Sequence, residues 1–216
     1  MQSFKVFSVL LSYPQEEWLA ALPELEGAVE AESTMNGNAC VELVPLLQAL
    51  RQGPLIHLQE EYVATFDRNP SHSLHLYEHI HGESRERGPA LVSLLEEYRQ
   101  HGLEISDAEL PDYLPLFLEF LSLLPQQEAT SLLGDAVHVI AAIGGRLAKN
   151  GSPYALVMRQ LESLSPVPAE ALIEPPVRDM DEAMEMFGPG SDGIEPLLKP
   201  RPEVAVVNFH PTKQPA

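Results

Sequence analysis

The sequence predicts an all-α fold, in which a single helical bundle is followed by a proline-rich tail. The 216 residues are 44% hydrophobic but only 6% aromatic, a leucine-rich profile more typical of helical than of β-rich proteins. Apolar side chains recur every three to four residues up to about residue 165. No stretch shows the alternating apolar and polar residues of a strand flanked by hairpin turns. A chain of this length suits one domain with a full hydrophobic core.

The first half of the bundle is expected to contain several short helices. Two are predicted near residues 4–11 and 15–31. Another runs from Pro54 to Phe66, because its apolar side chains fall on one face and proline suits the first helical turn. The same spacing predicts another helix from Leu91 to Tyr98, and Gly102, which follows it, is a suitable C-terminal cap.

The second half contains the longer apolar segments. A helix is predicted over residues 112–124, with Asp112 as its N-cap and Pro115 tolerated in its first turn. The longest helix is expected over residues 126–149, and a last one over residues 152–164. The long helix should bury Leu133, Val137, Ile140, Ile143 and Leu147.

The character of the chain changes after residue 165. Ten of the 20 prolines fall in residues 166–216, interspersed with charged and glycine residues. Such a segment cannot bury enough apolar surface to form a core. We therefore expect a helical domain over residues 1–165 and a disordered, acidic tail over residues 166–216.

Charge and cysteine content exclude several classes of protein. The formal net charge of −19 argues against nucleic-acid binding and is compatible with a basic partner. The single cysteine, Cys40, excludes an intramolecular disulfide and a four-cysteine metal site. The N-terminus is a poor signal peptide, and no run of about 20 apolar residues is evident. The chain is expected to act in the cytoplasm without inserting into a membrane.

The segment from Pro70 to Gly88 holds four of the eight histidines. Within it, His75, Glu78 and His79 match the H-x-x-E-H pattern of one class of zinc peptidase. Pro70 and Gly82 bracket this match, so the helix that such a site needs would be short. Three interpretations remain open: a metal-dependent hydrolase, a structural metal site that adds His72 or His81, and histidines that satisfy hydrogen bonds of a loop. The last is favoured.

Other signals of an enzyme are weak. Gly144 and Gly145 lack the G-x-x-x-x-G-K context of a phosphate-binding loop, and paired small residues in a helix more often permit close packing. No G-x-S-x-G motif supports a nucleophile. The residues alone favour a non-catalytic helical binding protein with a polar, histidine- and acid-rich patch, and with no bound cofactor.

Two segments resemble a known family. Residues 60–88 (EEYVATFDRNPSHSLHLYEHIHGESRERG) and 109–120 (ELPDYLPLFLEF) closely resemble the NarJ-type members of the all-helical TorD-like family, which are assembly chaperones. The resemblance covers most of residues 1–165. Tyr113 stands where the family signature usually has a histidine, as in the members that serve nitrate reductase.

The resemblance implies a dedicated chaperone of respiratory nitrate reductase. Such a protein binds the N-terminal segment of the apo catalytic subunit and holds that subunit back from the membrane until the molybdenum cofactor and the iron–sulfur cluster are inserted. An acidic groove would suit a basic amphipathic peptide. The expected peptide-binding residues are Tyr62, Phe66, Asp67, Pro70, His72, Leu74, His75, Tyr77, Glu78, His79, His81, Asp112, Tyr113 and Glu119. A chaperone of a different molybdenum reductase is the alternative within the family.

Overall fold

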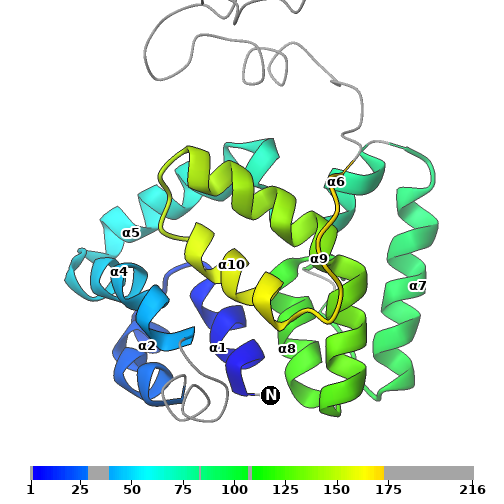
Figure 1. Cartoon of the computed structure of the whole chain (residues 1–216), viewed down its shortest axis with the longest axis horizontal. Helices are drawn as coiled ribbons and strands as arrows, with labels where there is room; N and C mark the ends of the chain where they lie inside the picture. Colours follow the sequence, from blue (N-terminus) through cyan, green and yellow to red (C-terminus); the bar gives the residue numbers. More distant parts are fainter. Residues whose placement is uncertain (1, 29–38, 83, 107–108, 173–216) are drawn as a thin grey trace, which may run out of the picture. The chain divides into compact units, whose positions relative to one another are not determined.

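The computed structural model describes residues 2–28, 39–82, 84–106 and 109–172, and in this part of the chain the regular structure is helical (Figure 1). The predicted all-α class is confirmed. The helices are α1 (Gln2–Leu10), α2 (Glu16–Ala20), α4 (Ala39–Gln52), α5 (Leu55–Tyr62), α6 (Leu76–His81), α7 (Arg87–Gln100), α8 (Leu114–Leu123), α9 (Gln126–Lys149) and α10 (Ala155–Leu164). Residues 22–28 are also helical.

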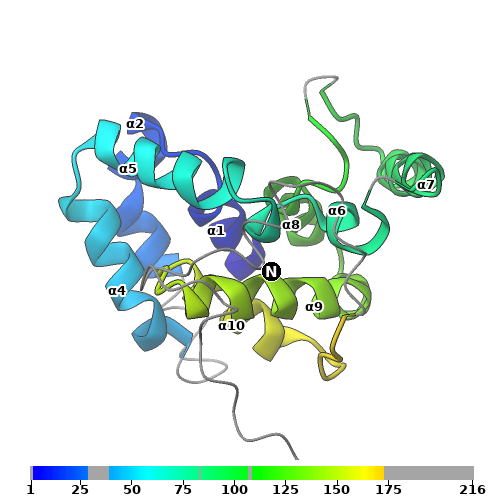
Figure 2. The ribbon, with the colours of Figure 1, turned by 90° about the horizontal axis from the view of Figure 1, so that it is seen from above.

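The core forms where two helix pairs meet. α9 packs along α10, and α1 packs along α8. Figure 2 shows α1 in the middle, with α9 and α10 on one side of it and α5 on the other. The predicted inner face of α9 is confirmed, because all five of its predicted core residues are fully buried. Burying a large aliphatic side chain contributes about 1.5–3 kcal/mol, so this face is a principal source of stability.

By length and mean hydropathy, α9 is also the one described helix that could cross a membrane, with a value of 1.3 over its most apolar window. A core helix of a globular domain meets the same criterion. Here α9 buries one face against the rest of the bundle, including α10.

Gly144 lies where α10 comes closest to α9. A Cβ atom added at Gly144 would lie 2.8 Å from Cβ of Met158, whereas one added at Gly145 would meet nothing within 4 Å. The predicted close helix contact is therefore made at the first glycine of the pair and not at the second.

We expect Gly144→Ala to destabilise the protein by about 1–2 kcal/mol, because overpacking costs about 1–3 kcal/mol and alanine's better helix propensity offsets part of it. Gly145→Ala is the matched control and should stabilise by about 0.5–1 kcal/mol. Urea unfolding followed by circular dichroism measures both. Equal stability of the two variants would contradict this packing.

Glycine ends α7 as predicted, and it also ends α9. Gly102 has φ of +76°, a left-handed conformation that costs glycine nothing. It is followed by a backbone bond of 3.0 Å from Leu103 N–H to the Tyr98 carbonyl, the pattern of a Schellman motif. Gly151, with φ of +69°, ends α9 in the same way.

Several helix boundaries differ from the prediction, and two of them lie next to the histidine-rich segment or next to Tyr113. α8 begins at Leu114 with Tyr113 as its N-cap, so the prediction of Asp112 as N-cap is wrong, although Pro115 does lie in the first turn. The predicted helix through Phe66 changes at Val63 into a π turn. A 3.0 Å hydrogen bond from the Arg68 N–H to the Val63 carbonyl closes this turn. Such wide turns are frequent at functional sites.

Residues 166–172 lie on α9, beyond the predicted domain boundary. The backbone N–H of Glu170 donates to Nδ1 of His138 at 2.9 Å, and Val167 approaches Gly134 closely. Leu172 packs against the core. Residues 173–216, where most of the predicted disordered tail falls, lie outside the described part of the chain, so their disorder stays a prediction.

Candidate functional site

The two segments singled out in the sequence lie side by side. His75 and Tyr113 form an antiparallel bridge. On either side of it, Leu114 N–H donates to the Leu74 carbonyl at 2.8 Å, and Leu76 N–H donates to the Asp112 carbonyl at 3.0 Å. The segment before α6 is therefore fixed against the start of α8, although the two are nearly 40 residues apart in sequence.

Asp112 is the centre of a buried polar network beneath this bridge. Its side chain is 0% exposed and accepts a 3.1 Å hydrogen bond from the Tyr77 backbone N–H. Nδ1 of His75 lies 3.3 Å from the other carboxylate oxygen, and Arg87 lies 3.9 Å away as an ion-pair partner. Arg87 also donates to Glu78 at 3.1 Å. The carboxylate of Asp112 thus joins α6 and α7 to the start of α8.

This burial corrects the expectation that Asp112 contacts a client peptide. A carboxylate with no exposed surface, and with its oxygens already bonded inside the protein, cannot reach a peptide on the outside. Its role in this structure is to position the segments around it.

Tyr62, Phe66 and Leu74 require the same correction. They are 3–4% exposed and belong to the core, where the rings of Tyr62, Phe66 and Tyr154 pack together. The apolar face of a peptide cannot lie among them without the bundle opening. The amphipathic pattern that predicted their burial was correct, and their use as a binding surface in this conformation was not.

Two of the four clustered histidines hold the loop before α6 to α9. Nδ1 of His72 donates to the Thr65 carbonyl at 3.0 Å, and its Nε2 accepts from Asn150 at 3.0 Å. Nε2 of His79 donates to the Ser73 carbonyl at 2.8 Å, and its Nδ1 accepts from Arg146 at 3.1 Å. Because a carbonyl only accepts and a guanidinium only donates, the His79 ring is neutral with its proton on Nε2. The Thr65 carbonyl places a proton on Nδ1 of His72.

The zinc interpretation does not fit this arrangement. α6 begins at Leu76, so His75 lies outside the helix and pairs with Asp112, while both ring nitrogens of His79 are engaged. Among the described residues, no group of three or more histidines, cysteines, aspartates or glutamates could hold a metal ion. The favoured interpretation, histidines that satisfy a loop's hydrogen bonds, describes His72 and His79.

Burial lowers the pKa of His72, and the nearby positive charge of Arg146 lowers it further. The unfolded chain therefore binds a proton near pH 6.5 that the folded chain does not, and stability should fall as pH drops below about 6.5. The free energy of unfolding should change with pH by at most about 1.4 kcal/mol per pH unit through this one group. Urea unfolding at pH 7.5 and 5.5 measures it. His72→Gln should flatten this dependence of stability on pH. His57→Gln, at an exposed position on α5, should not flatten it. Identical pH profiles for the two variants would contradict this assignment.

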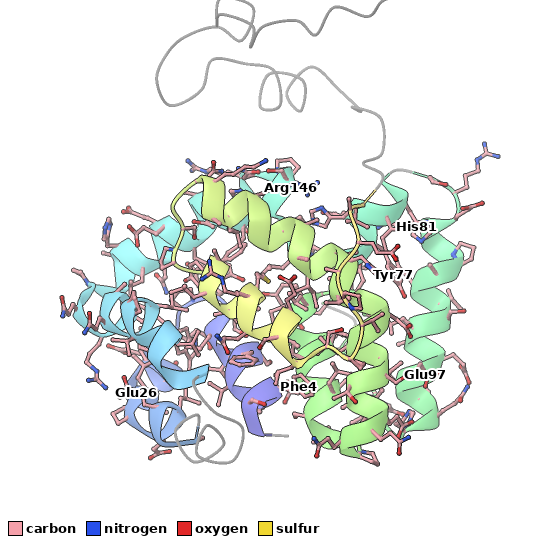
Figure 3. The ribbon with its side chains drawn as sticks, viewed as in Figure 1. Phe4, Glu26, Tyr77, His81, Glu97 and Arg146 are labelled. Carbon is pink, nitrogen blue, oxygen red and sulfur yellow. The ribbon has the colours of Figure 1, made fainter. Side chains whose placement is uncertain are left out.

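The remaining predicted residues around α6 are partly or fully exposed. Tyr77 and His81 lie close together on α6, with ring centroids 5.7 Å apart (Figure 3). Burial raises the pKa of Tyr77, and the Asp112 carboxylate adds to the shift. Asp67 and Pro70 are exposed. These side chains stay candidates for contact with a partner.

A pocket of about 350 Å³ opens on the other side of Tyr113, between α1, α2 and the first turns of α8. It combines aromatic rings, hydroxyl and amide groups, two carboxylates and one ammonium group. The lining residues are Lys5, Ser8, Val9, Ser12, Tyr13, Gln15, Trp18, Glu109, Tyr113 and Glu119. Of the predicted site residues, the pocket includes Tyr113 and Glu119.

Hydrogen bonds hold the pocket walls to the core. The Tyr113 hydroxyl lies 3.0 Å from that of Tyr62, which donates to the Leu11 carbonyl at 2.9 Å. Burial raises the pKa of both phenols, so they stay protonated. The Trp18 indole donates to the Tyr13 carbonyl at 3.0 Å. The rings are thus fixed in place before any ligand binds.

Carboxylates surround the Tyr113 hydroxyl. The charges of Glu109 and Asp67 add to the rise in its pKa, and Glu109 lines the same pocket as Tyr113. Glu119 reaches the pocket from α8. The pocket therefore brings the predicted residues Tyr113 and Glu119 together with Glu109 in one acidic region.

Most of the pocket was missed in the sequence. Its walls come from α1 and the turn into α2, far in sequence from the histidine-rich segment. The one available signal was Trp18, the single tryptophan of the chain, close after Tyr13.

Comparison with known proteins agrees with the resemblance seen in residues 60–88 and 109–120. Residues 30–158 match the family described as nitrate reductase delta subunit. The chain is 39% identical over 160 residues to the nitrate reductase molybdenum cofactor assembly chaperone NarJ of Escherichia coli strain K12, covering 74% of this chain and 68% of that protein. It is 34% identical over 159 residues to a protein of Bacillus subtilis strain 168 named as a probable NarJ, covering 74% and 85%.

A solved structure supports the fold. A crystal structure of an Archaeoglobus fulgidus protein assigned to redox enzyme maturation aligns with a TM-score of 0.55 and 24% identity, over 76% of this chain and 92% of that one. The family match spans more than half of the chain, and the NarJ alignments span most of it. The chain therefore belongs to the nitrate reductase delta subunit family.

Proposed function

We propose that the chain is a non-catalytic assembly chaperone of respiratory nitrate reductase. It binds the N-terminal segment of the apo catalytic subunit in the cytoplasm and keeps that subunit from the membrane until the molybdenum cofactor and the iron–sulfur cluster have been inserted. The relatives named as molybdenum cofactor assembly chaperones support the general role.

The pocket beside Tyr113 is the observation that carries the peptide-binding part of the proposal. Its aromatic walls, Tyr13, Trp18 and Tyr113, offer apolar contact, and Glu109 and Glu119 offer negative charge. An arginine suits this combination because its planar guanidinium stacks on aromatic rings and pairs with carboxylates. An anionic ligand would instead be repelled by the two carboxylates.

The charge of the whole chain favours the same partner. A net charge of −19 attracts a basic segment over distance and raises its rate of association. Because Glu119 and Asp67 are exposed, each should contribute to this rate and to its dependence on salt. No histidine is among the described residues that line the pocket, so protonation of histidines should have little direct effect there.

The test is a pull-down with the full chain as bait. The apo catalytic subunit of the nitrate reductase from the same organism should be retained, and the same subunit without its N-terminal segment should not. Retention of both forms alike would show that the segment is not the recognised element. Retention of another molybdenum reductase in place of this subunit would show that the client is different.

A further inference from the structure

The pocket already contains a cation of its own. Lys5, on α1, forms an ion pair with Glu119, on α8, and both are among the lining residues. The two side chains are 51% and 48% exposed, so the pair lies at the open edge of the pocket and not in the core. No other lysine or arginine is among the described residues that line it.

We propose that Lys5 is an internal competitor that lowers the affinity of the pocket for basic segments by occupying Glu119. In the free chaperone the ammonium group of Lys5 occupies the carboxylate, and an arginine of the bound segment displaces it. This inference rests on the proposed function, because it assumes that a basic segment enters the pocket.

The strength of the pair suits a competitor. An exposed ion pair contributes little to stability, so it can be exchanged at little cost. Lys5 nevertheless stays close to Glu119 because both are attached to the same fold, which gives the ammonium group a high effective concentration there. A cation of the client must therefore displace Lys5 before it can pair with Glu119, and this lowers its apparent affinity.

The chemistry of the pocket favours arginine over lysine in this exchange. A lysine of the client would replace one ammonium group with another and gain little. A guanidinium can pair with a carboxylate through two parallel hydrogen bonds, which an ammonium group cannot form. It can also stack on a ring such as that of Trp18 or Tyr13. Lys5 lowers the affinity by the same factor for every segment that must displace it, so the preference for arginine comes from Glu119 and the rings.

The experiment is a double-mutant cycle measured by calorimetric titration. The probe is a synthetic peptide of the N-terminal segment of the nitrate reductase catalytic subunit, together with a version in which each arginine is lysine. Lys5→Met should tighten binding of the first peptide by about 2–5-fold at low salt, the range expected for release of one exposed ion pair. The same substitution in a Glu119→Gln background should have no effect.

Two matched variants separate this mechanism from a general effect of charge. Lys149→Met removes a positive charge from the exposed end of α9 and should leave the affinity unchanged. Glu109→Gln should weaken binding, with the gain from Lys5→Met preserved, because Lys5 pairs with the other carboxylate.

Several results would overturn the inference. They are weaker binding by Lys5→Met, a gain that persists in the Glu119→Gln background, an equal gain from Lys149→Met, and an equal affinity of the unaltered chain for the arginine and lysine peptides. If the unaltered chain bound neither peptide, the proposed function itself would fail, and the role of Lys5 would fall with it.

Discussion

Replacing Asp112 with alanine is expected to lower the free energy of unfolding by about 3–5 kcal/mol, the usual cost of breaking a buried ion pair by removing one partner. Arg87 would lose one of its two carboxylates, and the Tyr77 backbone N–H would lose its acceptor. Because the network joins α6 and α7 to the start of α8, the loss should loosen these segments together.

Urea unfolding followed by circular dichroism measures this effect. Asp135→Ala, on the exposed face of α9, is the matched control and should change stability by less than about 0.5 kcal/mol. Asp112→Asn should lie between the two, since an amide can still accept from the Tyr77 N–H but carries no charge for Arg87. A cost below about 1 kcal/mol for Asp112→Ala would mean that the network is not the support described here.

Replacing Trp18 with alanine is expected to weaken binding of the client segment by about 2 kcal/mol or more, roughly 30-fold, because buried aromatic anchors carry much of the energy of an interface. Trp18 is half-buried and packs against the core, so the substitution should also cost some stability, and the fold of the variant has to be verified.

Calorimetric titration with the N-terminal peptide gives the affinity, and circular dichroism verifies the fold. Trp18→Phe keeps an aromatic surface and should retain most of the binding. As a control, Leu123→Ala, on exposed surface outside the pocket, should bind like the unaltered chain. Unchanged affinity of Trp18→Ala would place the peptide elsewhere on the molecule.

The helices could be predicted from sequence where local signals decide the structure. The bounds of α9 follow from its apolar period, and Gly102 ends α7 because a left-handed residue is needed there. The N-cap of α8 was misassigned because Asp112, an apparent cap by its type and position, bonds to Tyr77 instead. That choice depends on a segment about 35 residues away, which a local pattern does not include.

The candidate site was less predictable for the same physical reason. His72 and His79 are polar residues in a polar segment, yet they are buried. Asn150, which follows the end of α9, and Arg146, on α9, form hydrogen bonds with their rings. The acidic region around Tyr113 was partly foreseen through Glu119. The pocket itself was not, because its shape arises where α1 and α2 meet the start of α8.

We propose that the N-terminal segment of the catalytic subunit binds in the pocket beside Tyr113. Trp18 is the single tryptophan of the chain and lines this pocket, so its fluorescence reports on the site alone. Titration with a tryptophan-free peptide of that segment should produce a saturable change in Trp18 emission, with the same affinity as calorimetry. Binding detected by calorimetry without any change in Trp18 emission would contradict binding of the segment in this pocket.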